Sequence, residues 1–342
     1  MKTLLIDGDW NLKRNFKKRS DLYSRGEHCG GSYGALESIR SIVNRMLPDR
    51  VIVFWDGIMS GKLRKDYYPP YKENRNKSWD EETYYFSLEE IDEIKQEKHN
   101  ILQQKIKVKN YLEELFIRQV EVDYIEADDL IAFYVLKKLN SEHVFIFSSD
   151  KDFYQLIQRG VSVIRPSDGL IIGIDNFKNL FGYTILNSLF LRCFEGDKSD
   201  NIDGIRGVTL NQLKKFFPKF LEEKYTLDKI IEEATALYEQ KKYKVLESII
   251  NCRKTMERNR TLMNLKRPFV TEEAKREVMD VSNYPIVDPD NPNERSIQNA
   301  MRMLVGDGFK RFLIDEDINF FFRPFYRLMT KEKEYTKSLL ES

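Results

Sequence analysis

Acidic residues follow the ends of apolar segments through the first 200 residues of this 342-residue chain. Segments such as 3–6, 51–55 and 144–147 alternate with stretches of helical periodicity, which predicts an α/β fold with a parallel sheet flanked by helices. Because ligands of such sheets bind at the carboxyl ends of the strands, we expect these acids to gather at one edge. The nine acids are Asp7, Asp56, Glu126, Asp128, Asp129, Asp150, Asp152, Asp197 and Asp200.

Carboxylates that lie close together cannot all stay ionised unless cations neutralise them. Oxygen ligands in this number indicate Mg²⁺ or Mn²⁺, in two or more ions. The three histidines and three cysteines are scattered, so neither a histidine metal site nor a zinc knuckle or disulfide framework is supported. Such cysteine usage favours a reducing, cytoplasmic setting. No segment approaches the ~20 apolar residues of a membrane span, so we expect no membrane partner.

The basic residues are concentrated locally, although 56 basic and 55 acidic side chains leave the net charge near zero. Segment 61–77 is rich in Lys and Arg and contains several tyrosines. A basic segment beside an acidic pocket suits a polyanion that is cleaved with metal ions, and the tyrosines could stack on a splayed base. A solvated face is the alternative for such a charge run. The candidate contacts to such a polyanion here are Lys62, Arg64, Tyr71, Lys72 and Arg75.

The chain divides by pattern into three regions. We expect an α/β domain over 1–183 with an excursion at about 58–118, a helical region over 184–270, and a helical extension over 271–342. Within the first region, periodicity predicts helices at 32–46, 88–116, 127–139 and around 154–157, and strands at 120–125, 143–148, 161–164 and 170–172. Further on, helices are expected at 186–194, ended by Gly196, and at 210–217, with Thr209 as the N-cap residue.

Six motifs occur in an order that matches one family. They are Leu5-Ile6-Asp7-Gly8 with Arg14, Phe54-Trp55-Asp56-Gly57, Tyr71-Lys72-Glu73-Asn74-Arg75, Glu126-Ala127-Asp128-Asp129, Ser148-Ser149-Asp150-Lys151-Asp152 and Gly196-Asp197-Lys198-Ser199-Asp200-Asn201. Over about residues 3–265 the chain resembles the flap endonuclease / 5′-3′ exonuclease family. The similarity is greatest to phage members, including T-even phage ribonuclease H, and to the 5′-nuclease domain of bacterial DNA polymerase I.

The resemblance implies a PIN-like fold with a helical arch and a helix–three-turn–helix, which makes 1–183 the catalytic domain and 184–270 the DNA-binding region. It implies a first metal group of Asp7, Asp56, Glu126, Asp128, Asp129 and Asp150, and a second of Asp152, Asp197 and Asp200. Lys72 and Arg75 would meet the scissile phosphate at the arch base, and Arg14 would also contact the DNA. The substrate would be flap, nicked or RNA-primed duplex DNA in a bacterial or phage-infected cytoplasm. The protein would act as a monomer, and a single-strand-binding protein is a candidate partner.

The segment after Asp200 is expected to hold duplex DNA. Gly204 and Gly207 allow a close turn that leads into a helix N-terminus, whose amides can bind a phosphate. Lys214 and Lys215 follow on that helix. The family's hairpin has a glycine where this chain has Thr209, which puts a K⁺ site at the hairpin in question.

Three other functions fit parts of the pattern. A phosphatase of the haloacid dehalogenase class would use Asp7 and Asp9 as nucleophile and acid, but it leaves Asp56 and the Glu126–Asp129 run without a role. A non-catalytic DNA-structure binder would be expected to lose metal ligands, and all nine are present. A PIN-type ribonuclease for single-stranded RNA would not need the hairpin after Gly196. The structure-specific 5′ nuclease accounts for more of these features.

Overall fold

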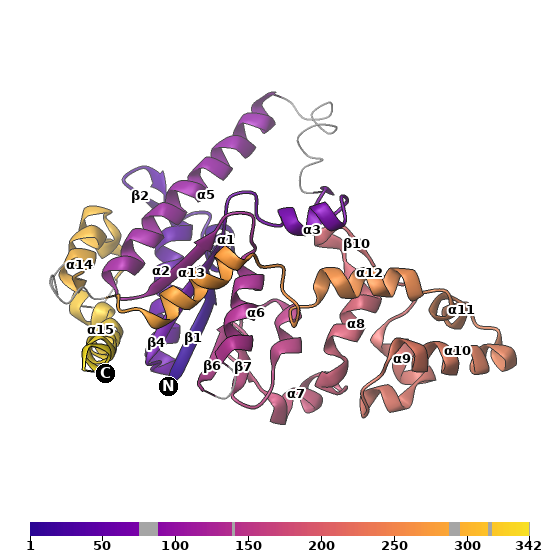
Figure 1. The fold of residues 1–342 in the computed structure, drawn as a ribbon. Coiled ribbons are helices and arrows are strands. Elements are labelled where there is room, and N and C mark those ends of the chain that lie inside the picture. The colour runs from indigo at the N-terminus through magenta and orange to yellow at the C-terminus, as the bar shows by residue number, and fades with distance from the viewer. Residues whose placement is uncertain (75–87, 139–140, 287–294, 314–316, 342) are drawn as a thin grey trace. The chain divides into compact units, whose positions relative to one another are not determined.

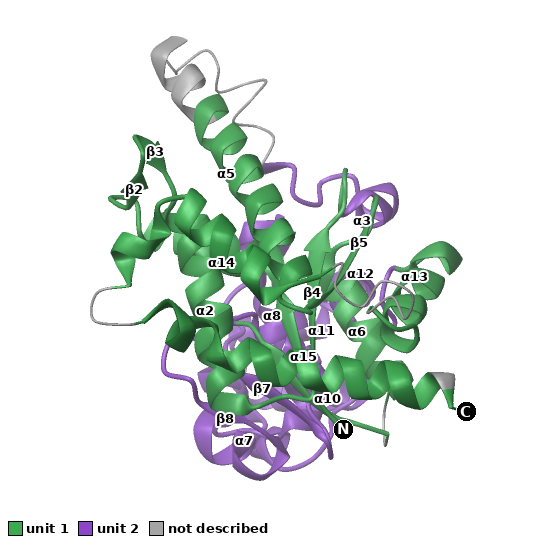
Figure 2. Ribbon diagram, turned by 90° about the vertical axis from the view of Figure 1, so that its left-hand side faces the viewer, with its two compact units in different colours: residues 1–60, 86–148, 270–342 green, residues 61–85, 149–269 purple. Residues whose placement is uncertain are grey.

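A computed structural model describes residues 1–74, 88–138, 141–286, 295–313 and 317–341 (Figure 1). The chain forms two compact units, each considered separately here. Unit 1 comprises residues 1–60, 86–148 and 270–342, and unit 2 comprises residues 61–85 and 149–269 (Figure 2).

Unit 1 is built on parallel strands. They run in the order β5 (Arg118–Val122), β4 (Arg50–Asp56), β1 (Lys2–Asp7) and β6 (His143–Phe147). The side chains of β1 and β4 are almost all buried, because helices cover both faces of these strands. The predicted parallel sheet is therefore confirmed, and Asp7 and Asp56 end neighbouring strands.

The helices of unit 1 come from residues 8–138 and from the last part of the chain. Helix α1 (Gly8–Lys18) packs on α2 (Gly30–Met46), and both contact α5 (Leu88–Glu114). Helix α6 (Ala127–Lys138) lies on β4 and β1. Between α1 and α2, strands β2 (Tyr23–Ser24) and β3 (Glu27–His28) form a hairpin. From the last part of the chain, α13 (Glu272–Asn283) packs on β5 and α6, α14 (Ile297–Gly306) on α5, and α15 (Ile318–Leu340) on α2 and β4; the 3₁₀ turn η6 (Phe309–Phe312) lies between α14 and α15.

A buried ion pair attaches α15 to the sheet. The Arg118 guanidinium donates from Nε to Glu332 Oε1 at 3.0 Å and from Nη2 to Glu332 Oε2 at 2.5 Å. Both residues are only 1% exposed. Arg50, which is 2% exposed, places its Nε 3.8 Å from Glu332 Oε1. One carboxylate near the end of the chain thus neutralises two arginines that begin β4 and β5.

Unit 2 is mainly helical. Its two strands β7 (Val161–Ile164) and β8 (Ile171–Ile172) are antiparallel. Helix α8 (Ser188–Glu195) leads through the short antiparallel pair β9 (Gly196–Asp197) and β10 (Ile202–Asp203) into α9 (Leu210–Phe216). The remaining elements are α3 (Lys62–Tyr67), η2 (Lys151–Leu156), α7 (Ile174–Phe181), η3 (Ile185–Asn187), η4 (Lys198–Asp200), η5 (Pro218–Leu221), α10 (Leu227–Lys241), α11 (Lys244–Ile250) and α12 (Arg253–Met263).

Several expected elements differ in detail. The strand predicted over 120–125 ends at Val122, because the chain turns through Tyr124, whose φ is +70°. The helix expected around 154–157 is the 3₁₀ helix η2, which begins at Lys151 and ends at Leu156. The basic excursion contains a helix, α3, while its residues 75–87 lie outside the described part of the chain.

None of the helices in the described part of the chain combines the length and apolar composition that crossing a bilayer requires. The three-domain division remains a prediction.

Candidate active site

Two carboxylates at strand ends in unit 1 each accept a main-chain hydrogen bond. Asp7 caps α1, since its Oδ1 accepts from the N–H of Trp10 at 3.0 Å. Asp56 Oδ1 accepts from the N–H of Ala127 at 3.0 Å, at the first residue of α6. Each of these bonds uses one carboxylate oxygen, so capping and metal binding are compatible for both residues.

Glu126, Asp128 and Asp129 form an acidic cluster at the start of α6. One oxygen from each lies within 4.8 Å of the other two. Glu126 and Asp129 are 4% and 1% exposed, so their negative charges are largely shielded from water. Ligand oxygens around an ion with bonds of ~2.1 Å lie about 3–4 Å apart. A small contraction would therefore let this cluster hold a hard divalent cation, and the residues fit the metal that the sequence indicates.

The surroundings of Asp9 disfavour the phosphatase alternative, in which this residue would be the general acid. Its carboxylate is 7% exposed, and Oδ2 accepts hydrogen bonds from the Asp56 N–H at 2.8 Å and Lys105 Nζ at 3.1 Å. A general acid must reach the leaving group of the substrate. Asp9 is instead engaged with the protein's own main chain.

In unit 2 an arginine joins two of the predicted metal ligands. Arg192 Nε donates to Asp152 Oδ1 at 2.5 Å, and its Nη2 donates to Asp197 Oδ2 at 2.8 Å. The structure therefore brings Asp152 and Asp197 to one cation. The sequence analysis missed Arg192, although its position on α8 four residues before Gly196 was a usable signal: one helical turn places its side chain beside the motif.

Asp150 and Asp197 differ in their proton affinity. Loss of hydration and the negative charge of Asp152 raise the pKa of Asp150 to about 7. Burial also acts to raise the pKa of Asp197, but hydrogen bonds from Ser199 and the charge of Arg192 outweigh it and lower that pKa overall. A divalent cation at Asp150 would favour its ionised form, as expected for a carboxylate ligand.

Asp200 contacts Tyr71 and Lys72, at the base of the predicted arch. Its Oδ2 accepts a hydrogen bond from the Tyr71 hydroxyl at 3.2 Å and lies 3.9 Å from Lys72 Nζ. The Asp200 carbonyl accepts from the Lys72 N–H at 2.9 Å. Lys72 has a φ of +54°, a conformation that costs energy for a residue with a side chain. The surrounding bonds hold it there, so Lys72 has a fixed place beside a predicted metal ligand.

Two predicted DNA contacts need correction. Tyr71 is 2% exposed and packs with Ile202, Leu262 and Met263, so its ring has no face on which a base can stack. Arg64 is 3% exposed, and its Nε donates to the carbonyl of Leu262 at 2.9 Å. Both residues pack the arch base internally instead of presenting a surface to DNA.

Lys62 and Arg14, two further predicted DNA contacts, are not buried. Lys62 pairs with Asp66 at 2.6 Å and is partly exposed, and the Arg14 guanidinium lies 5.4 Å from the centroid of the Trp10 ring. Arg75 lies outside the described residues.

The predicted hairpin forms a tight turn before α9. The N–H of Val208 donates to the carbonyl of Ile205 at 3.0 Å, and Gly207 has a φ of +78°. A side chain at Gly204 would meet the Phe194 and Glu195 carbonyl oxygens at 2.4 and 2.3 Å. Thr209 caps α9 as predicted, because its Oγ1 accepts a hydrogen bond from the Gln212 N–H. Lys214 is partly buried and Lys215 is exposed on that helix.

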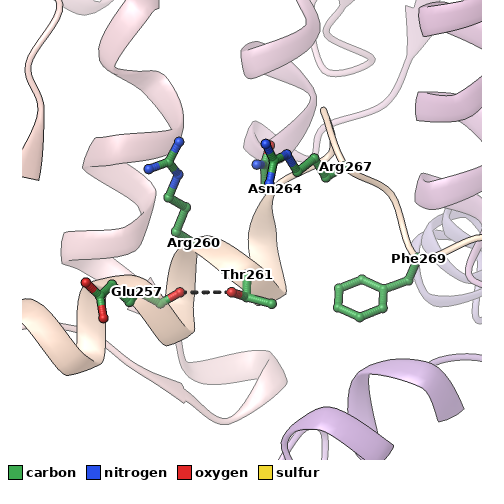
Figure 3. Close-up of a pocket in the computed structure, with 6 residues that line it drawn as sticks. All are labelled: Glu257, Arg260, Thr261, Asn264, Arg267 and Phe269. Atoms are coloured by element: carbon green, nitrogen blue, oxygen red, sulfur yellow. Dashed lines mark hydrogen bonds between the residues drawn. The ribbon is translucent and has the colours of Figure 1, made fainter.

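A pocket of unit 2 lies at the end of α12. A cavity of about 480 Å³ is lined by Glu257, Arg260, Thr261, Asn264, Arg267 and Phe269 (Figure 3). None of the predicted site residues lines it. Its side chains include two arginines and one carboxylate, so its chemistry differs from that of the acidic clusters.

Comparison with known proteins settles the family. The sequence profile described as 5′-3′ exonuclease, N-terminal resolvase-like domain, matches residues 2–182, more than half of the chain. The chain belongs to the 5′-3′ exonuclease family. A 5′-3′ exonuclease of Aquifex aeolicus is 30% identical to this family member over 224 residues, which cover 63% of the chain and 70% of that protein.

Solved structures share the fold of this 5′-3′ exonuclease family member. A protein of bacteriophage T5, co-crystallised with metal ions, gives a TM-score of 0.61 at 19% identity and covers 89% of this chain and 99% of its own. The T5 flap endonuclease, in a pseudo-enzyme-product complex with DNA and metal ions, gives 0.59 at 18% identity with the same coverage. The predicted α/β, PIN-like fold is confirmed.

Proposed function

We propose that this protein is a structure-specific, metal-dependent 5′ nuclease, acting as a flap endonuclease and 5′-3′ exonuclease on DNA during replication. The observation that carries the proposal is the acidic cluster of Glu126, Asp128 and Asp129 in a member of the 5′-3′ exonuclease family. Family relatives named 5′-3′ exonucleases and a T5 neighbour named a flap endonuclease support the activity.

The nine acids of the six motifs are the proposed ligands of two or more Mg²⁺ or Mn²⁺ ions. Such ions would activate a water molecule and neutralise charge on the phosphoryl oxygens. Asp7, Asp56, Glu126, Asp128, Asp129 and Asp150 are the proposed first group of ligands. Asp152, Asp197 and Asp200 are the proposed second group, in which Arg192 orients the carboxylates of Asp152 and Asp197.

The substrate and setting are inferred from the same family. We propose flap, nicked and RNA-primed duplex DNA as substrates, with ribonuclease H activity on the primer. A single-strand-binding protein is the proposed partner of a monomeric enzyme in the cytoplasm of a bacterium or phage-infected cell. K⁺ at the hairpin is part of the proposal, although Thr209 replaces a glycine there.

An assay with two substrates tests the activity. A fluorescent 5′-flap DNA and a chromogenic phosphomonoester are incubated with the protein in Mg²⁺, with EDTA as the control. Cleavage of the flap alone is the expected result, whereas release from the monoester alone would favour a phosphatase. Binding without cleavage would identify a DNA-structure binder. Mapping products from flap, nicked and RNA–DNA substrates to single nucleotides then separates endonuclease, exonuclease and ribonuclease H action.

Replacing Lys72 by Ala is expected to slow the chemical step more than it weakens DNA binding. A cation held at the scissile phosphate acts mainly on charge that develops in the transition state, so a ~10²–10³-fold loss of single-turnover rate is expected. Rapid-quench kinetics at saturating enzyme measure that rate, and fluorescence anisotropy measures affinity. The exposed Lys178, which pairs with Glu222, provides a matched control as Lys178→Ala. A loss of affinity with an intact bound-state rate would make Lys72 a phosphate-positioning residue only.

Replacing Gly207 by Val is expected to weaken binding of flaps with a long downstream duplex and to broaden the cleavage position. The left-handed φ of Gly207 disfavours a β-branched residue, so the turn that presents the hairpin amides would change. A short single-stranded substrate should be bound as by the parent. Gly26 is the matched control, because its φ of +85° is similar and no atom lies within 4 Å of an added Cβ at either position. Equal losses on both DNAs would show that the hairpin does not bind duplex.

A further inference from the structure

A buried ion pair lies behind the end of β4. Asp9 Oδ2 accepts a hydrogen bond from the Asp56 N–H at 2.8 Å, and Lys105 Nζ donates to the Asp56 carbonyl at 2.9 Å. The ring closes through the 3.1 Å contact between Lys105 Nζ and Asp9 Oδ2. Asp9 is 7% exposed and Lys105 is 9% exposed. Both main-chain polar groups of Asp56, its N–H and its carbonyl, are therefore hydrogen-bonded to charged side chains.

The sheet explains why side chains are needed here. Strand β1 pairs with β4 only as far as Asp7 opposite Phe54, two residues short of Asp56. The chain then turns into α1 at Gly8, so β1 cannot supply an acceptor further along. A buried N–H without an acceptor is costly. Asp9, in the first turn of α1, provides the acceptor that the strand no longer offers.

Lys105 has no donor left for a substrate. Besides Asp9 and the Asp56 carbonyl, its Nζ donates to Glu121 Oε1 at 2.9 Å. An ammonium group carries three N–H donors, and these three acceptors use all of them. Lys105 comes from α5, and Glu121 from β5, so the ammonium joins a helix and a strand to the end of β4. An effect of Lys105 on catalysis would therefore act through the groups that it holds, among which only Asp56 is a proposed metal ligand.

We propose that Lys105 and Asp9 are positioning residues that fix the main chain of Asp56, and with it the carboxylate that binds metal in the proposed function. The inference rests on that function only in assigning Asp56 as a ligand. Asp56 Oδ1 also accepts from the N–H of Ala127, the residue between Glu126 and Asp128. A shift of the Asp56 main chain would thus move its carboxylate oxygens. Through the bond to Ala127, it would also move the first residues of the acidic cluster.

Binding of Mn²⁺ in the absence of DNA tests the proposal directly. Titrations followed by electron paramagnetic resonance compare the parent with Lys105→Met and Asp9→Asn. Loss of a group that orients a metal ligand typically costs 10–100-fold in metal affinity or activity, and this range is expected for Lys105→Met. DNA affinity in Ca²⁺ should stay at the parental value. Asn keeps an acceptor for the Asp56 N–H, so Asp9→Asn should lose less than Asp9→Ala.

Lys109 offers a matched control on the same helix. It donates to the other carboxylate oxygen of Glu121, whereas Lys105 alone of the two reaches Asp9 and Asp56. Lys109→Met should bind Mn²⁺ as the parent does. Parental Mn²⁺ affinity in a folded Lys105→Met, or an equal loss in Lys109→Met, would overturn the proposal. If Lys105→Met does not fold, the Asp9→Asn and Asp9→Ala pair decides by the same criterion. A parent that binds Mn²⁺ but cleaves no DNA would refute the proposed function and leave this comparison valid.

Discussion

Replacing Asp128 by Asn is expected to lower the single-turnover rate of flap cleavage by ~10³-fold or more. Asn keeps the size of the side chain and an acceptor for the Asp129 N–H, which now donates to Asp128 Oδ1 at 2.8 Å. It removes one negative charge from a cluster whose oxygens lie within 4.8 Å of one another. Charge stabilisation by a bound metal contributes several kcal/mol, and about 4 kcal/mol corresponds to a thousandfold in rate. Rapid-quench kinetics in saturating Mg²⁺ measure the effect.

DNA affinity should be unchanged or higher in Asp128→Asn, because one charge that repels phosphate is removed. Asp7→Asn and Asp150→Asn are expected to behave in the same way. The exposed Asp21 supplies the control, since Asp21→Asn removes an equal charge outside the proposed ligand set. A rate for Asp128→Asn within about tenfold of the parent would amount to less than ~1.4 kcal/mol and would rule out the cluster as the metal site.

Replacing Glu332 by Ala is expected to destabilise the protein by ~3–5 kcal/mol. The substitution leaves two arginines, Arg118 and Arg50, without their shared counter-charge at positions that are 1% and 2% exposed. Removing one partner of a buried ion pair is costly for this reason. Arg50 Nε already lacks a hydrogen-bond partner in the described part of the protein. No hydrogen bond at that nitrogen therefore compensates when the Glu332 charge is removed. Chemical denaturation followed by circular dichroism gives the free energy of unfolding.

Glu334 provides the control on the same helix. It pairs with Lys331 at 2.9 Å and is 59% exposed, so Glu334→Ala should change stability by less than ~1 kcal/mol. A double variant, Arg118→Met with Glu332→Met, should recover part of the loss, because an apolar pair can replace a buried ion pair at little cost. A stability change for Glu332→Ala no larger than that for Glu334→Ala would mean that the buried pair does not anchor α15.

This ion pair also shows why residues 270–342 matter to the fold of unit 1. The matched family region ends at residue 182, yet α13 and α15 cover β5 and β4. Without residues 270–342, Arg118 and Arg50 would begin two sheet strands without the Glu332 carboxylate that pairs with both. We therefore interpret the extension as a structural component of unit 1.

The sequence by itself determined the strands and the identity of the acids. Continuous apolar runs can be buried on both faces only in a covered parallel sheet, so β1 and β4 followed from local composition. Asp7 and Asp56 come directly at their ends, and Thr209 caps α9 because its hydroxyl needs only a neighbour three residues away. These features depend on short-range geometry, which a linear pattern contains.

Only the tertiary structure revealed which side chains hold those acids and which are buried. Lys105 and Asp9 are 96 residues apart, Arg192 and Asp152 are 40 apart, and Arg118 and Glu332 are 214 apart. Tyr71 seemed available for base stacking by its place among basic residues, but packing buries its ring. Charge pairing and burial over such separations are set by the packing of elements that are distant in the chain, and no periodicity or motif spacing encodes that packing.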